Sequence, residues 1–164
     1  MTQQSTGAAL VFALAIFGGL YLTRDAELGR QAPDFFLPET SGGHVGLESY
    51  RGQPLLLVFW TTSCGICRRE LPAMSQMAPE FRSKGIAVVA IHLGEAEDVR
   101  DFMQSNHIAL TSLVDAEGLV GQAYRVGGVP KLVLIGTDGK IKRTKAGMAD
   151  ESELREWMDA LRAS

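Results

Sequence analysis

The stretch L-L-L-V-F-W-T-T-S-C-G-I-C, residues 55–67, decides the fold of this 164-residue chain. Its first six residues form a continuous apolar run of strand length. Such a run predicts a strand buried on both faces, as in a parallel sheet covered by helices. Apolar residues recur at helical spacing after Cys64. The two cysteines of the chain, Cys64 and Cys67, are therefore expected where a buried strand passes into a helix.

The spacing of these cysteines indicates redox chemistry. Two intervening residues allow the two sulfur atoms to bridge within one helical turn. At a helix N-terminus, unpaired backbone N–H groups and the helix dipole favour the thiolate, which is the form that attacks disulfides. Arg68 and Arg69 add positive charge in the next turn. We therefore expect Cys64 to be the nucleophile and Cys67 to resolve the mixed disulfide, with this cysteine pair as the redox group and no other cofactor.

Three other interpretations of the cysteine pair are half of a zinc site, a static structural disulfide, and two unrelated core cysteines. A zinc site needs two further ligands. The histidines of the chain are His44, His92 and His107, and no two of them have ligand spacing. We therefore expect no metal site and interpret the histidines as surface or strand-end residues.

The overall composition excludes several classes of protein. The chain has 16 basic and 19 acidic residues, so its net charge of −3 gives no reason to expect a nucleic-acid partner. Two cysteines are too few for a disulfide-stapled mini-protein. The length suits one domain with a sizeable core.

The N-terminal segment differs from the rest because residues 1–23 contain no Asp, Glu, Lys or Arg. The apolar run 7–22 is just long enough to cross a bilayer as a helix. A cleaved signal peptide would need a basic start and a small-residue cleavage site, and a buried core helix would need a polar face. We therefore expect a single transmembrane anchor at 1–23, a polar tether at 24–31 and a domain at 32–164.

In the rest of the chain, strands first alternate with helices and a hairpin and a helix follow. Strands are expected at 33–38, 45–47, 55–60, 86–91, 110–114, 132–135 and 141–145, and helices from 64 onward and at 95–105, 119–124 and 150–161. This order predicts an α/β domain with a mixed sheet, parallel in its first half and flanked by helices, preceded by an N-terminal β-hairpin. Asp150 and Glu153 predict a capping box for the last helix.

The chain resembles the thioredoxin superfamily, and within it the membrane-anchored thiol–disulfide oxidoreductases of the TlpA/ResA type (DsbE/CcmG-like). The resemblance extends over 32–161. It depends on A-P-D-F-F-L-P, on the stretch from residue 55 to L-P at 71–72, on G-G-V-P-K-L-V-L-I and on D-G-K-I. The stretch A-Y-R-V-G-G-V-P also resembles the neighbouring MauD-type maturation proteins.

The resemblance implies roles for four further residues. Pro130 matches the cis-proline that faces the disulfide in this superfamily, which would expose the backbone of Val129 to a substrate chain. Glu70 follows Cys67 by three residues and matches a glutamate proposed to exchange a proton with the resolving thiol. Trp60 is expected to pack beneath the site, with one edge open to substrate.

The sequence also departs from its relatives. Val58 replaces the buried aspartate of thioredoxins, Ser63 replaces the tryptophan that often precedes the first cysteine, and the central dipeptide is Gly65-Ile66. Two other functions share part of this pattern. The T-x-x-C at 61–64 is typical of peroxidases of the peroxiredoxin type, but the proline expected before it is Leu57. Copper chaperones of the SCO type use C-x-x-x-C and a distant histidine, whereas the spacing here is C-x-x-C and no motif surrounds His44, His92 or His107.

The resemblance thus implies an enzyme that reduces disulfides of extracytoplasmic client proteins, apocytochrome c or another maturation client among them. Its partners would be the client disulfides, a membrane thiol–disulfide electron donor and, through the anchor, the lipid bilayer. Because such chemistry needs an oxidising compartment, we expect a single-pass protein of the bacterial inner membrane with its catalytic domain in the periplasm.

Overall fold

The computed structural model describes residues 27–95 and 97–162. The predicted transmembrane anchor, 1–23, lies outside these residues. Within the described part of the chain, no helix is long and apolar enough to span a bilayer.

A five-stranded mixed sheet in the order β5-β4-β3-β6-β7 forms the centre of the domain. The strands are β3 (Leu55–Trp60), β4 (Ala87–Leu93), β5 (Thr111–Asp115), β6 (Lys131–Ile135) and β7 (Ile141–Ala146). β3 pairs in parallel with β4 and antiparallel with β6, so it is the middle strand, and all six of its residues are buried. The prediction of a buried strand at 55–60 and of a mixed sheet is confirmed.

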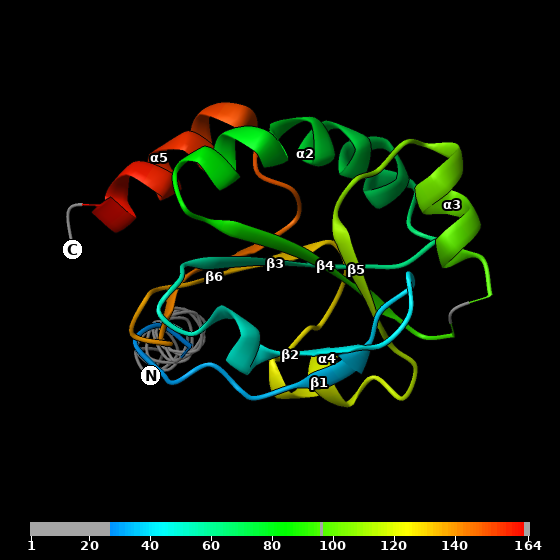
Figure 1. Ribbon diagram of the computed structural model, residues 1–164, viewed down its shortest axis with the longest axis horizontal. Helices are drawn as coiled ribbons and strands as arrows, with labels where there is room; N and C mark the ends of the chain where they lie inside the picture. The colour runs from blue at the N-terminus through cyan, green and yellow to red at the C-terminus, as the bar shows by residue number, and fades with distance from the viewer. Residues whose placement is uncertain (1–26, 96, 163–164) are drawn as a thin grey trace, which may run out of the picture.

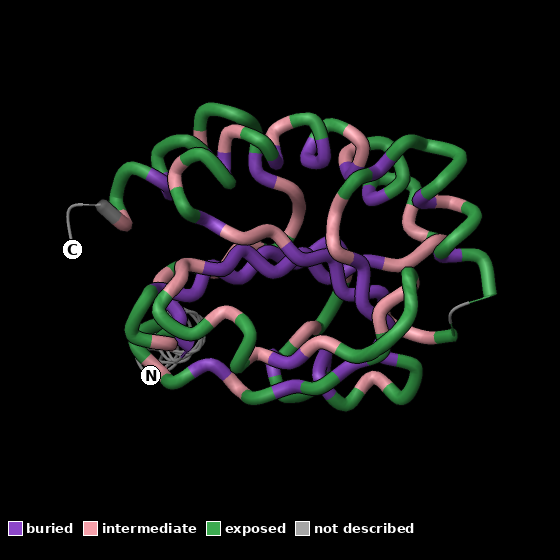
Figure 2. The backbone as a smooth tube through the Cα atoms, in the orientation of Figure 1, coloured by how far each residue is buried: buried purple, intermediate pink, exposed green. Residues whose placement is uncertain are grey.

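Helices and a hairpin cover the two faces of this sheet (Figure 1). On one face lie α2 (Gly65–Ser83), α3 (Val99–Ser105) and α5 (Glu151–Arg162). On the other lie α4 (Leu119–Ala123), the short 3-10 helix η1 (Leu47–Tyr50) and the predicted hairpin of β1 (Phe36–Pro38) and β2 (His44–Gly46). Alternate residues of β3 enter two separate apolar clusters, one on each face, and Figure 2 shows the buried sheet between its exposed covers.

One helix differs in part from the prediction. A helix was expected at 95–105, but α3 begins only at Val99. Gly94 has a positive φ of 100°, a turn conformation that helices do not contain, and the chain needs further residues to leave β4. The helix expected from residue 64 onward is α2, which continues through Pro72 and Pro79 to Ser83.

Of the two hydrogen bonds that make up the capping box predicted for α5, the one accepted by Asp150 is present. Asp150 Oδ1 accepts a hydrogen bond from the backbone N–H of Glu153 at 2.9 Å. This bond lowers the pKa of Asp150, together with a larger contribution from the Ser152 hydroxyl. The Glu153 carboxylate, however, pairs with Lys145 on β7. The second half of the box is therefore replaced by an ion pair that joins α5 to the sheet edge.

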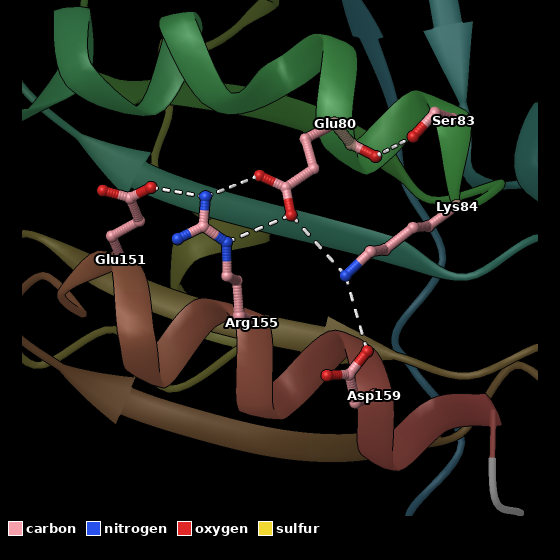
Figure 3. A network of polar contacts seen from close by, with 6 residues as sticks. All are labelled: Glu80, Ser83, Lys84, Glu151, Arg155 and Asp159. Atoms are coloured by element: carbon pink, nitrogen blue, oxygen red, sulfur yellow. Dashed lines mark hydrogen bonds and ion pairs between the residues drawn. The ribbon is translucent and has the colours of Figure 1, made fainter.

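Charged residues connect α5 to α2 on the surface (Figure 3). Arg155 donates to both carboxylate oxygens of Glu80, at 3.1 and 2.9 Å, and also pairs with Glu151. Lys84 pairs with Glu80 and with Asp159. Because of the bonds from Arg155, the pKa of Glu80 lies below its usual value. This network lies in solvent, where such pairs stabilise little.

The described part of the predicted tether, residues 27–31, packs on the domain. The Gly29 N–H donates to the Ile141 carbonyl oxygen at 2.8 Å, and Gln31 forms a β-bridge with Lys140. The Glu27 carboxylate lies 2.9 Å from Nζ of Lys131, and both residues are only 8% exposed. The segment before the hairpin is thus held against β6 and β7.

Candidate functional site

A disulfide between Cys64 and Cys67 lies at the carboxyl end of β3, where the chain enters α2. The two Cα atoms are 5.2 Å apart. Cys64 is the N-cap residue of α2, and its Sγ accepts a hydrogen bond from the Cys67 N–H at 3.1 Å. Cys64 is partly exposed, whereas Cys67 is 1% exposed. The sulfur that an incoming substrate can reach is therefore that of Cys64.

The three-residue loop 61–63 holds Cys64 at the start of the helix. The Thr61 carbonyl oxygen accepts a hydrogen bond from the Cys64 N–H at 3.2 Å. The hydroxyl groups of Thr61 and Ser63 lie 3.1 Å apart and share a hydrogen bond. The Thr61 hydroxyl, which belongs to the T-x-x-C pattern, is thus directed toward Ser63.

The loop before β6 lies against the disulfide, as the resemblance implies. The Val129–Pro130 peptide bond is cis. The carbonyl oxygen of Val129 lies 3.8 Å from Sγ of Cys64, and the Pro130 carbonyl oxygen accepts a hydrogen bond from the Gly147 N–H. Cys64 and Val129 are therefore neighbours at one edge of the site, although they lie 65 positions apart in the sequence.

Glu70 lies on α2, one turn beyond Cys67. Its side chain is 37% exposed, and its carboxylate accepts a hydrogen bond from Nε of the neighbouring Arg69 at 2.8 Å. Glu70 also lines a groove of about 490 Å³ between α2 and the segment 148–155. The Glu70 carboxylate is therefore in contact with solvent.

Trp60 lies beneath the site, but it offers no edge to a substrate. Its side chain has no exposed surface, which corrects the expectation of an open edge. The indole packs against Phe102 of α3 at 5.3 Å and meets the His92 ring edge-on at 5.1 Å. Its Nε1 has no hydrogen-bond partner among the described residues. Any effect of Trp60 on the cysteines is therefore exerted through packing.

Sequence reasoning missed two buried polar residues near the site. His92, interpreted as a strand-end or surface residue, does lie near the end of β4 but is only 4% exposed. Lys131 directly follows Pro130, and its Nζ contacts Glu27 and the carbonyl oxygens of Tyr124 and Arg125. The available signal was that each residue directly adjoins an apolar strand expected from the sequence, 86–91 or 132–135, because burial of a polar residue at such a position requires a partner.

A metal centre needs a cluster of ligating side chains. Across residues 27–95 and 97–162, no group of three or more His, Cys, Asp or Glu side chains is placed to hold a metal ion. His92 is occupied by two hydrogen bonds to the backbone.

A central β-strand, a C-x-x-C disulfide at the N-terminus of the following helix and a cis-proline beside it together define a thioredoxin-like thiol–disulfide oxidoreductase. The family model described as "AhpC/TSA family" matches residues 28–144, and the chain belongs to this family. The thiol-disulfide oxidoreductase ResA of Bacillus subtilis is 30% identical over 163 residues, covering 96% of this chain and 91% of that protein.

Solved structures of similar proteins agree with this class. A chain assigned as a thiol:disulfide interchange protein DsbE from Chlorobium tepidum is 33% identical, with a TM-score of 0.75, covering 82% of this chain and 97% of its own. A secreted Mycobacterium tuberculosis disulfide oxidoreductase, described as homologous to Escherichia coli DsbE, is 28% identical, with a TM-score of 0.66 and coverages of 77% and 96%.

Proposed function

We propose that this enzyme reduces disulfides of specific extracytoplasmic client proteins through the Cys64/Cys67 pair, its sole redox group. The observation that carries the proposal is the contrast between the two sulfurs: Cys64 is accessible at the helix N-terminus and Cys67 is buried one turn deeper. An exposed thiol at this position attacks, and a buried neighbour completes the exchange.

The reaction transfers two electrons in two exchanges. The Cys64 thiolate attacks one sulfur of the client disulfide, the client's other sulfur leaves as a thiolate, and a mixed disulfide forms. Cys67 then loses its proton and attacks Sγ of Cys64. The Cys64–Cys67 disulfide forms and the second client sulfur is released, so the client is reduced and the enzyme is oxidised. A membrane thiol–disulfide electron donor returns the two electrons.

The site and the comparisons suggest how clients bind and where. The Val129 backbone beside Cys64 is placed to pair with a client chain, and cis-Pro130 shapes this edge. A similar oxidoreductase is described as secreted, and the uncharged residues 1–23 are expected to form a membrane anchor. We therefore propose that the domain lies in the periplasm, attached to the inner membrane. Apocytochrome c or another maturation protein would be the client.

Trapping of clients tests this function. Cys67→Ala leaves the attacking thiol in place but removes the thiol that resolves the mixed disulfide. We expect this variant to accumulate client–enzyme disulfides in cells, visible as bands that disappear on reduction. The matched control, Cys64→Ala, should trap none. If Cys67→Ala captures no periplasmic protein while the wild type stays redox-active, the client proposal is wrong.

We further propose that Glu70 exchanges a proton with Cys67 during the second step. If so, Glu70→Gln slows resolution of a preformed mixed disulfide about tenfold and changes its pH profile. The control is Glu80→Gln, on the same helix but in the α5 network. Resolution rates between about pH 5 and pH 9 that equal those of the wild type would reduce Glu70 to a surface residue.

A further inference from the structure

His92 is a buried histidine directly beneath the loop that carries Cys64. It stands opposite Trp60 in the parallel pairing of β4 with β3, and its ring packs against Trp60, a member of the apolar cluster on the α2 side of the sheet. The ring meets the Trp60 indole at 79°, which fixes the plane of the imidazole. The residue is only 4% exposed, so solvent does not satisfy its nitrogen atoms.

Both ring nitrogens of His92 bond to backbone groups. The Thr62 N–H donates to Nε2 at 3.1 Å, so Nε2 must carry no proton. Nδ1 lies 3.2 Å from the Gly94 carbonyl oxygen and therefore carries the proton and donates. The two contacts together require a neutral ring with one tautomer. Thr62 belongs to the loop that leads to Cys64. In this loop, the Thr61 carbonyl oxygen accepts a hydrogen bond from the Cys64 N–H.

We propose that neutral His92 is a positioning residue for Cys64: it holds the 61–63 loop through Thr62, and disulfide exchange at Cys64 slows when its ring is protonated. A protonated Nε2 carries an N–H of its own, which cannot accept the Thr62 N–H and instead opposes it. The loop then loses the bond that fixes it above β4. This inference rests on the proposed function, because it concerns Cys64 as the attacking thiol.

The surroundings of His92 agree with a neutral ring. Burial lowers the pKa of His92 below its ordinary value, although the Gly94 carbonyl opposes this shift. Charged groups on the adjoining elements include Arg68 on α2, whose guanidinium lies over Phe102, and Asp115 at the end of β5, whose carboxylate accepts the Gly121 N–H. Further titratable side chains are those of Glu95, Glu97 and Asp98 after β4, and the Cys64 and Cys67 thiols in the reduced enzyme.

The test measures the rate constant for alkylation of Cys64 in the fully reduced full-length protein. At each pH this rate constant is divided by the fraction of Cys64 present as thiolate, which gives a corrected rate constant. Three variants are compared with the wild type. His92→Leu removes the acceptor, His92→Gln offers a carbonyl oxygen that accepts but does not titrate, and His44→Gln changes an exposed histidine of the hairpin. Iodoacetamide is the probe, and mass spectrometry assigns the label to Cys64.

We expect His92→Leu to lower the corrected rate constant about tenfold at neutral pH and His92→Gln to restore it to within about threefold. Between about pH 7 and pH 4, the ratio of wild type to His92→Gln should fall, because only the wild type loses its acceptor. His44→Gln should follow the wild type. A ratio that stays flat over this range, or a rate for His92→Leu equal to the wild type, would overturn the proposal.

This design keeps the inference apart from the proposed function. Alkylation needs no client, so failure to trap a client would leave the His92 measurement interpretable. If His92→Leu does not fold, the comparison of wild type with His92→Gln still decides the question, since both side chains accept from Thr62 at neutral pH.

Discussion

Replacing Cys64 with alanine is expected to abolish disulfide reduction, with a loss of at least about a thousandfold in the rate of client or model-disulfide reduction. Cys64 carries the sulfur that solvent reaches, and it accepts the Cys67 N–H at the start of α2. In the reduced enzyme, the same N–H groups and the helix dipole would stabilise its thiolate. Cys67, at 1% exposure, cannot take over the attack.

The two single-cysteine variants allow a direct comparison of the two thiols. In Cys67→Ala the remaining thiol is Cys64, and we expect rapid reaction with iodoacetamide. In Cys64→Ala the remaining thiol is Cys67, and we expect reaction about a hundredfold slower, because burial denies the reagent access. Insulin reduction in the presence of dithiothreitol measures the activity of each. Faster alkylation of Cys67 than of Cys64 would reverse the two roles and contradict the mechanism.

Local patterns in the sequence predicted most of the fold. The apolar run 55–60 predicted the central strand, and the C-x-x-C that follows it predicted the disulfide at the helix start. These features depend on neighbours in sequence, so a single chain reveals them. The site edge at Val129 and Pro130 came from the resemblance alone, because no local pattern indicates that this loop meets Cys64.

The features that sequence reasoning missed depend on contacts between distant residues. His92 and Thr62 are 30 positions apart, and Glu27 and Lys131 are 104 apart. Residue type alone does not indicate whether a histidine near a strand end faces solvent or the loop that follows the neighbouring strand. In the same way, the polar segment 27–31 shows no periodicity, since it is held by single backbone bonds and one ion pair rather than by an apolar face.

The second large effect concerns this ion pair, which joins the N-terminal segment to the strand that follows cis-Pro130. Lys131 Nζ lies 3.1 and 2.9 Å from the Glu27 oxygens and also donates to the carbonyl oxygens of Tyr124 and Arg125. Removal of one member of a buried pair leaves a charge without its partner in a poorly solvated place. We therefore expect Glu27→Leu to cost about 3 kcal/mol of unfolding free energy, and Lys131→Met a similar amount.

The double variant distinguishes a buried pair from two independent contacts. When both charges are replaced by apolar side chains, no unpaired charge remains, so the double variant should lose about 1 kcal/mol or less. Urea unfolding of the oxidised protein, followed by the fluorescence of buried Trp60 and Trp157, measures all three. Arg155→Ala is the matched control, because its pairs with Glu80 and Glu151 lie in solvent and should matter far less (Figure 3). A Glu27→Leu variant as stable as Arg155→Ala would show that Glu27 does not hold the buried Lys131 charge. A double variant whose loss of unfolding free energy equals the sum of the two single losses would also contradict a buried pair.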